Sequence, residues 1–121
     1  MYAEAATASR LRIMKAEILR VTTSAPDLAT AKHLARDAVS ARLAGNAMIV
    51  GPVVSVFRDM REINEATEYQ LALSTTKAAL PVLVRHLTEN HPWENPDITA
   101  IPLVYASDVY MTWLQEVVNV D

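Results

Sequence analysis

Two kinds of hydrophobic pattern alternate along the chain, one typical of strands and one typical of helices. Residues 18–23 form an apolar, β-branched run of strand length. After it, apolar residues recur every three or four positions, as on the buried face of a helix. They are Leu28, Ala31, Leu34, Ala35, Ala38, Val39 and Leu43. Residues 24–27 carry a proline and a polar capping candidate, so they predict the start of this helix, and Gly45-Asn46 predict its end.

A long two-stranded ribbon is predicted next. Residues 47–58 predict a strand that is interrupted at Gly51-Pro52, because proline is tolerated in a sheet only at edges and bulges. After a predicted turn at 59–62, residues 63–74 alternate between apolar and polar side chains. A strand of that length is about 40 Å long, at roughly 3.3–3.4 Å per residue, which is about twice the usual length.

The ribbon is too long for the sheet that the rest of the chain can build. A helix of about sixteen residues covers about 24 Å, so roughly 15 Å of ribbon would project without cover. An isolated hairpin is at best marginally stable in water, and bare strand edges favour pairing with other chains. We therefore expect the ribbon to dock on another copy of the chain in a closed homo-oligomer.

The remaining elements complete an α+β pattern. A second helix is predicted from near Ala78 to the break at His91-Pro92, after possible caps at Thr75 and Thr76, with apolar residues at Leu80, Leu83, Val84 and Leu87. Residues 98–103 predict a short edge strand. Ser107-Asp108 predict the cap of a last helix that carries Tyr110, Met111, Trp113, Leu114, Val117 and Val118. This order predicts a ferredoxin-like split βαβ sandwich with an extra C-terminal helix.

Domain organisation and compartment follow from the same patterns. Residues 1–12 are expected to be a flexible N-terminal tail, and residues 13–121 a single domain. The N-terminal residues lack the apolar stretch of a secretory signal, and no run has the length of a membrane span, so a cytoplasmic location is expected.

Composition excludes several classes of function. The chain has 121 residues, a net charge of −3 and no cysteine, which excludes disulfides, thiolate zinc sites and cysteine nucleophiles. Its two glycines, Gly45 and Gly51, cannot build the common phosphate-binding loops. No Gly-x-Ser-x-Gly elbow is present, and the acidic balance disfavours nucleic acid and anionic membranes as partners. A non-enzymatic protein is expected.

Several motifs resemble the CutA family, the divalent-cation tolerance proteins. The most specific is His91-Pro92-Trp93-Glu94-Asn95-Pro96-Asp97, which is followed by an apolar strand that ends in Pro102. Weaker matches in the same order are Ala25-Pro26-Asp27, Arg42-Leu43-Ala44, Thr75-Thr76 and Tyr110-x-x-Trp113. The resemblance covers nearly all of residues 18–118. It implies a ferredoxin-like homotrimer in which long β-ribbons pair between subunits, and a role in the tolerance of, or response to, divalent metal ions.

This chain departs from the family at positions that bear on metal binding. Asn46 stands where the family usually has cysteine, and the copper-type site inferred for some members corresponds here to Thr23, Asn90 and Asp97. Ligation by soft thiolate is therefore impossible. The turn tryptophan and glycine of the family correspond to Asp59 and Arg61, so Arg61 would be strained if that turn needs a positive φ.

Two sets of candidate site residues result. His91, Glu94 and Asp97 lie at i, i+3 and i+6 and predict weak binding of a divalent cation such as copper or zinc. In the alternative interpretation, His91 caps a helix and the two acids are ordinary loop residues.

The second set is a ligand cleft between subunits. Its candidates are Glu68, which matches an acid typical of the family, and the aromatic residues Trp93, Tyr110 and Trp113. The alternative is that the aromatic residues only pack. Two other functions stay open: a trimeric small-molecule sensor like the PII signalling proteins, with ligands in clefts between subunits, and a trimerising scaffold.

Overall fold

The order of elements predicted from the sequence is confirmed. The computed structural model describes residues 17–120, so the tail predicted at 1–12 and the first residues of the predicted domain lie outside the described residues. The elements are β1 (Ile18–Ala25), α2 (Leu28–Ser40), β2 (Asn46–Asp59), β3 (Glu62–Thr76), α3 (Leu80–Asn90), β4 (Ile98–Pro102) and α4 (Asp108–Val117).

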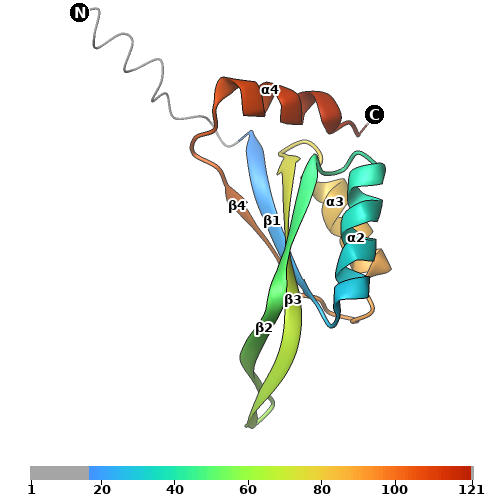
Figure 1. Ribbon diagram of the computed structural model, residues 1–121, viewed down its shortest axis with the longest axis vertical. Helices are drawn as coiled ribbons and strands as arrows, with labels where there is room; N and C mark the ends of the chain where they lie inside the picture. The colour runs from blue at the N-terminus through green and yellow to red at the C-terminus, as the bar shows by residue number, and fades with distance from the viewer. Residues whose placement is uncertain (1–16, 121) are drawn as a thin grey trace, which may run out of the picture.

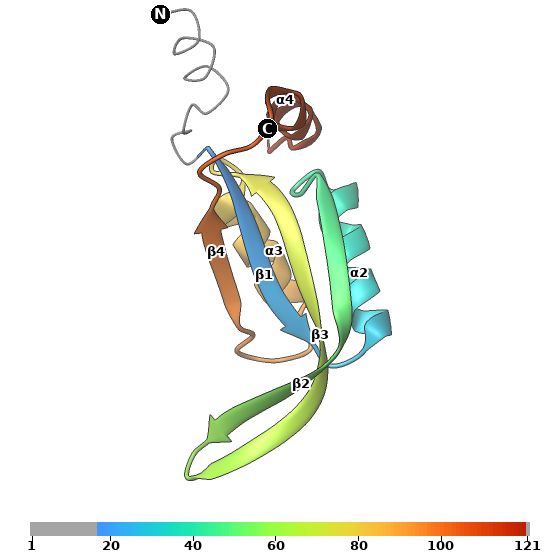
Figure 2. The same ribbon diagram turned by 60° about the vertical axis from the view of Figure 1, so that its left-hand side comes forward.

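The four strands form one antiparallel sheet in the order β2-β3-β1-β4. Helices α2 and α3 cover one face of this sheet, and α4 lies across the end of the sheet where β1 begins (Figure 1 and Figure 2). The fold is therefore α+β and ferredoxin-like, with an additional C-terminal helix, as predicted. Within residues 17–120, β4 pairs only with β1, so its proline-containing sequence lies at an edge of the sheet, as predicted.

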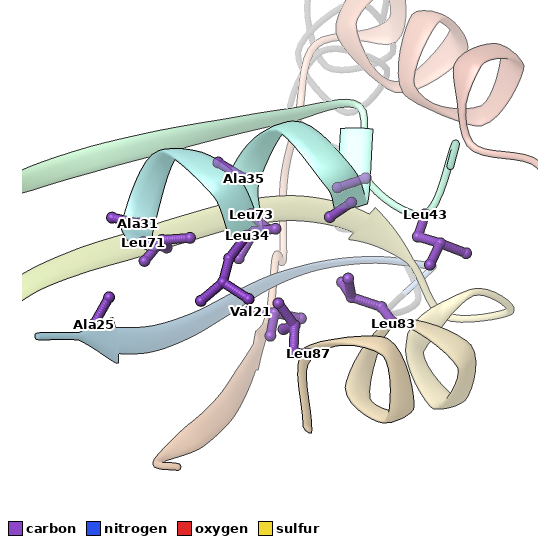
Figure 3. Close-up of a cluster of buried hydrophobic side chains, with 12 residues drawn as sticks. Val21, Ala25, Ala31, Leu34, Ala35, Leu43, Leu71, Leu73, Leu83 and Leu87 are labelled. Carbon is purple, nitrogen blue, oxygen red and sulfur yellow. The ribbon is translucent and has the colours of Figure 1, made fainter. Parts of the chain in front are cut away.

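The main core lies between the sheet and the two helices (Figure 3). Strand alternation turns Val21, Leu71 and Leu73 towards the helices, where they are fully buried. The side chains that meet them from α2 and α3 are Ala31, Leu34, Ala35, Ala38, Leu83 and Leu87. Leu28 and Val39, which the helical pattern assigned to the same buried face, are 40% and 37% exposed.

Polar side chains cap the N-terminal ends of α2 and α4. The side chain of Asp27 accepts a 2.7 Å hydrogen bond from the backbone N–H of Thr30, which identifies Asp27 as the N-cap of α2. This backbone bond, helped by the Thr30 hydroxyl, lowers the pKa of Asp27 from its usual value of 3.8. Ser107 caps α4 in the same way, as predicted. α3 begins at Leu80, slightly later than predicted, and Thr76 accepts a hydrogen bond from Ala79 N–H just before it.

The end of α2 differs from the prediction that Gly45-Asn46 terminate it. The helix ends at Ser40, and Arg42 follows in the left-handed region with φ 61°. The strain of this conformation is offset by three hydrogen bonds to the C-terminal end of α4. The Arg42 guanidinium donates to the carbonyl oxygens of Glu116 and Val117 at 2.8 and 3.0 Å. The backbone carbonyl oxygen of Arg42 accepts a hydrogen bond from the backbone N–H of Asn119. Arg42 therefore lies at the end of α2 and connects it by hydrogen bonds to the end of α4.

Gly45 serves the packing of α4. A second buried cluster joins Ile18 and Ala79 to Leu114 of this helix and to Val118, the residue that follows it. A Cβ atom added at Gly45 would lie 2.5 Å from Leu114 Cδ1. The residue is therefore glycine because α4 approaches its backbone closely, and not because a helix ends there.

The ribbon predicted from strand length is present, and we call its projecting part the arm. It consists of residues 53–59 of β2 paired with residues 62–68 of β3, beyond the last β3 residue that pairs with β1 (Figure 1). The predicted interruption is also confirmed, because the pairing shifts between Val50 and Val53. Gly51 lies there against the ring of Tyr69, whose Cδ2 would be 2.4 Å from an added Cβ. At the tip, Met60 and not Arg61 has the positive φ, at 55°.

Replacing Gly45 with alanine should destabilise the protein by about 1–3 kcal/mol, since overpacking forces Leu114 out of a filled site. Denaturant unfolding at a fixed protein concentration measures this loss. In the double variant Gly45→Ala/Leu114→Ala, the loss should be smaller than the sum of the two single losses. A Gly45→Ala protein as stable as the parent would contradict the packing role.

Candidate functional site

A cleft of about 700 Å³ lies where the arm leaves the sheet. One side is the arm, the floor is the end of β1 and β3, and the other side is the segment 91–97, which we call the cleft loop. The residues that line it are Ser24, Val53, Val54, Ser55, Phe57, Glu68, Gln70, Trp93, Asn95 and Asp97. The cleft therefore exists because the arm continues past the body of the sheet.

Strand register explains why these side chains meet. Successive side chains of a strand point to opposite faces, so Glu68 and Gln70 lie on the face opposite to buried Leu71. Val53 pairs with Glu68, and Ser55 and Phe57 follow on the same face of the arm. Ser24 pairs with Gln70 across β1 and β3, which places it on that face too. The cleft thus belongs to the face of the sheet that the helices leave uncovered.

The lining combines negative charge with aromatic surface. It contains the carboxylates of Glu68 and Asp97 and no lysine or arginine. Hydroxyl and amide groups come from Ser24, Ser55, Gln70 and Asn95, and aromatic rings from Phe57 and Trp93. Such a surface can bind a small molecule by hydrogen bonds and ring contacts. Among the lining residues, no imidazole is available to activate a serine hydroxyl.

Hydrogen bonds fix the cleft loop to β1. His91, the residue that follows α3, is buried, and its Nε2 lies 2.7 Å from the carbonyl oxygen of Ser24. Its Nδ1 accepts a 3.1 Å hydrogen bond from the backbone N–H of Trp93, and the two rings contact each other with their centroids 5.0 Å apart. At the other end of the loop, the hydroxyl of Ser24 donates to the Asp97 carboxylate at 2.9 Å.

The predicted cation ligands His91, Glu94 and Asp97 are not assembled into a site. Over residues 17–120, no group of three or more histidine, aspartate and glutamate side chains is arranged to hold a metal ion. Both ring nitrogens of His91 already have backbone partners, and Asp97 has Ser24. The three residues as placed in one chain do not fit a metal ion. His91 does occupy the C-terminal cap position of α3, as the alternative interpretation expected.

The four predicted cleft residues separate into two pairs. Glu68 and Trp93 line the cleft together. Tyr110 and Trp113 lie on α4 at the opposite end of the sheet, where their ring centroids are 5.7 Å apart and the Tyr110 hydroxyl donates to Ser74 Oγ. One chain therefore brings together half of the predicted set. It also adds Ser24, Phe57 and Gln70, which only the strand register could have indicated.

Among the described residues, no helix is long and apolar enough to cross a membrane.

Comparison with known proteins agrees with this geometry. Residues 19–117 match the family described as CutA1 divalent ion tolerance protein. The divalent-cation tolerance protein CutA of Escherichia coli O139:H28 is 29% identical over 94 residues, which cover 78% of this chain and 84% of that protein.

Solved structures give the same result. The divalent cation tolerance protein of Thermus thermophilus is 30% identical, with a TM-score of 0.82 over 84% of this chain and 99% of that one. CutA from Synechococcus elongatus PCC7942 is 29% identical, with a TM-score of 0.84 over 88% of this chain and 95% of that one. With its fold, its motifs and its sequence in agreement, the chain belongs to the CutA family of divalent-cation tolerance proteins.

Proposed function

We propose that the protein acts as a non-enzymatic homotrimer in the tolerance of, or response to, divalent cations, with its functional site in clefts between protomers. The observation that carries this proposal is the arm. Residues 62–68 of β3 pair with β2 on one side and have no strand on the other within residues 17–120. At roughly 3.4 Å per residue, the arm extends about 24 Å beyond the shared sheet.

The side chains of the arm also favour burial by another copy. Val56 and Ile63 share the arm face opposite to the cleft and are 63% and 67% exposed in the single chain. The uncovered face of the sheet carries further exposed apolar residues, namely Met48, Val50 and Ile101. Apolar surface on both the arm and the sheet favours a contact in which one protomer's arm packs on its neighbour.

Assembly would also explain why the four predicted cleft residues lie at two opposite ends of one chain. Glu68 and Trp93 lie at the arm end of a chain, and Tyr110 and Trp113 lie at the α4 end. In a closed ring with head-to-tail contacts, unlike ends of neighbouring protomers meet. We place the complete cleft at that junction, where each protomer supplies one pair.

Any divalent-cation contact in this site is proposed to be weak. The chain has no cysteine, and His91 is engaged with the backbone, so the remaining ligands are oxygen atoms such as those of Glu68 and Asp97. Oxygen ligands of this kind do not give the tight copper or zinc binding of thiolate and imidazole sets.

The cleft itself favours a second candidate function, a PII-like sensor of a small molecule. Its volume of about 700 Å³ is in the range of small-molecule sites, and its polar and aromatic side chains can form hydrogen bonds and ring contacts with a ligand. The purely structural role of a trimerising scaffold is the third outcome.

Calorimetric titration of the assembled protein separates these functions. Cu²⁺, Zn²⁺ and a panel of nucleotides are titrated separately into the parent protein and into Glu68→Gln. Heat with a metal ion that Glu68→Gln reduces supports the cation function, and heat with a nucleotide supports the sensor. No heat with any of them contradicts both and leaves the scaffold. The cytoplasmic location expected from the sequence is proposed with the function, and cell fractionation checks it.

The substitution Val56→Asp should dissociate the trimer, because it places a charge on the arm face that we assign to the contact. Light scattering should give three times the chain mass for the parent protein and a lower mass for the variant. Leu28→Asp is the matched control, since Leu28 is also exposed but lies at the start of α2. A monomeric parent protein, or a trimeric Val56→Asp variant, would contradict the proposed contact.

Gly51→Ala should weaken the same assembly, because it should change the direction in which the arm leaves the sheet. The added Cβ would displace the Tyr69 ring at the point where the arm leaves the sheet. We expect the trimer to dissociate at a protein concentration about tenfold higher, as measured by sedimentation. Because the dissociation constant of a trimer varies with the square of the concentration, this shift corresponds to about 2.8 kcal/mol per trimer. Adding Tyr69→Ala removes the clash and should restore part of the affinity. An unchanged dissociation concentration in Gly51→Ala would show that this close contact does not direct the arm.

A further inference from the structure

We infer that His91 is the positioning residue of the cleft loop, a neutral imidazole that holds Trp93 in the cleft wall and is not a metal ligand. This inference rests on the proposed function in one respect, namely that the cleft is the functional site. The geometry that supports it lies within one chain.

The hydrogen-bond partners of His91 determine its protonation. The partner of Nε2 is the carbonyl oxygen of Ser24, which can only accept, so Nε2 carries the proton and donates. The partner of Nδ1 is the backbone N–H of Trp93, which can only donate, so Nδ1 is unprotonated and accepts. The ring is therefore neutral, with its single proton on Nε2, and both nitrogens are in use.

Ser24 forms hydrogen bonds with residues at both ends of the cleft loop. Its carbonyl oxygen accepts from His91, and its hydroxyl donates to Asp97. Ser24 and His91 are only 5% and 9% exposed, so these bonds are largely shielded from water. Pro92 and Pro96 each fix one backbone angle between the two attachment points. Trp93, which lies between them and contacts the His91 ring, is thereby held where it lines the cleft.

This arrangement is incompatible with metal coordination by His91. A metal ion needs a free nitrogen lone pair, and the lone pair of Nδ1 is directed at Trp93 N–H. Coordination through Nε2 would remove its proton and leave the buried carbonyl oxygen of Ser24 without a donor. The histidine of the most specific family motif in this chain thus shapes the cleft, and a cation response operates without it as a ligand.

Nitrogen-15 NMR of the parent protein at neutral pH tests the assignment without any substitution. We expect the His91 ring to show a protonated Nε2 and an unprotonated Nδ1, with neither signal shifted by excess Zn²⁺. His33 is the internal control, because its side chain is 66% exposed and can meet the ion. Protonation on Nδ1, or a saturable Zn²⁺ shift of the His91 nitrogens, would overturn the inference.

Fluorescence tests the positioning role. The chain has only two tryptophans, so in a Trp113→Phe background the emission reports Trp93 alone. We expect His91→Phe, which keeps a ring but loses both hydrogen bonds, to shift Trp93 emission to the red and to increase its quenching by acrylamide. His91→Gln, whose amide nitrogen can still donate to Ser24, should change both less.

Equal emission and quenching in the background and in a folded His91→Phe variant would show that only ring packing matters, and would overturn the positioning role. Circular dichroism checks the fold, and if His91→Phe does not fold, His91→Gln and the NMR of the parent protein decide. Light scattering on the same samples reports assembly separately. A trimer whose His91 binds Zn²⁺ would therefore refute this inference alone, whereas a monomer would refute the proposed function.

Discussion

Along the arm, one backbone edge of β3 is paired by no strand of residues 17–120. Beyond Ala25, the last residue of β1, the strand β3 continues for residues 62–68 with a partner on one side only. Half of the N–H and C=O groups along such an edge point away from the partner strand, and its apolar side chains stay in water. In the assembly that we propose, a second copy of the chain supplies both the backbone partners and the cover. The cleft and the contact that we propose at the exposed face of the sheet both follow from this constraint.

The same constraint determines where the site lies. The arm leaves the sheet at the register shift between Val50 and Val53, and its residues that line the cleft lie across from the cleft loop. Gly51 lets the backbone of β2 lie close to Tyr69, because the Tyr69 ring occupies the space that a side chain at position 51 would fill. Hydrogen bonds from both ends of the cleft loop to Ser24 then fix the opposite wall. The shape of the cleft therefore depends on the close contact at Gly51 and on the hydrogen bonds of the cleft loop to Ser24. It does not depend on a set of metal ligands.

Local patterns predicted most of the fold and less of the site. Strand alternation and helical spacing predicted every element, the interruption at Gly51-Pro52 and the surplus length of the ribbon, because these are properties of consecutive residues. The role of Gly45 was misassigned, since its reason is the approach of α4, a contact between residues about seventy positions apart. Likewise, spacing in the motif suggested His91 as a ligand, whereas its partners depend on where β1 ends. Long-range contacts of this kind leave no local signal.

Membership in the CutA family gives this chain a class of function, and the arm is the basis of the assembly that we propose for it. Hydrogen–deuterium exchange along β3 tests the basis most directly. In the assembled protein, the amides of residues 62–68 that point away from β2 should exchange as slowly as those of residues 69–76, which β1 covers. If those outward amides exchange at the rate of an unprotected chain while residues 69–76 stay protected, the arm is not buried by a neighbour and the account is wrong.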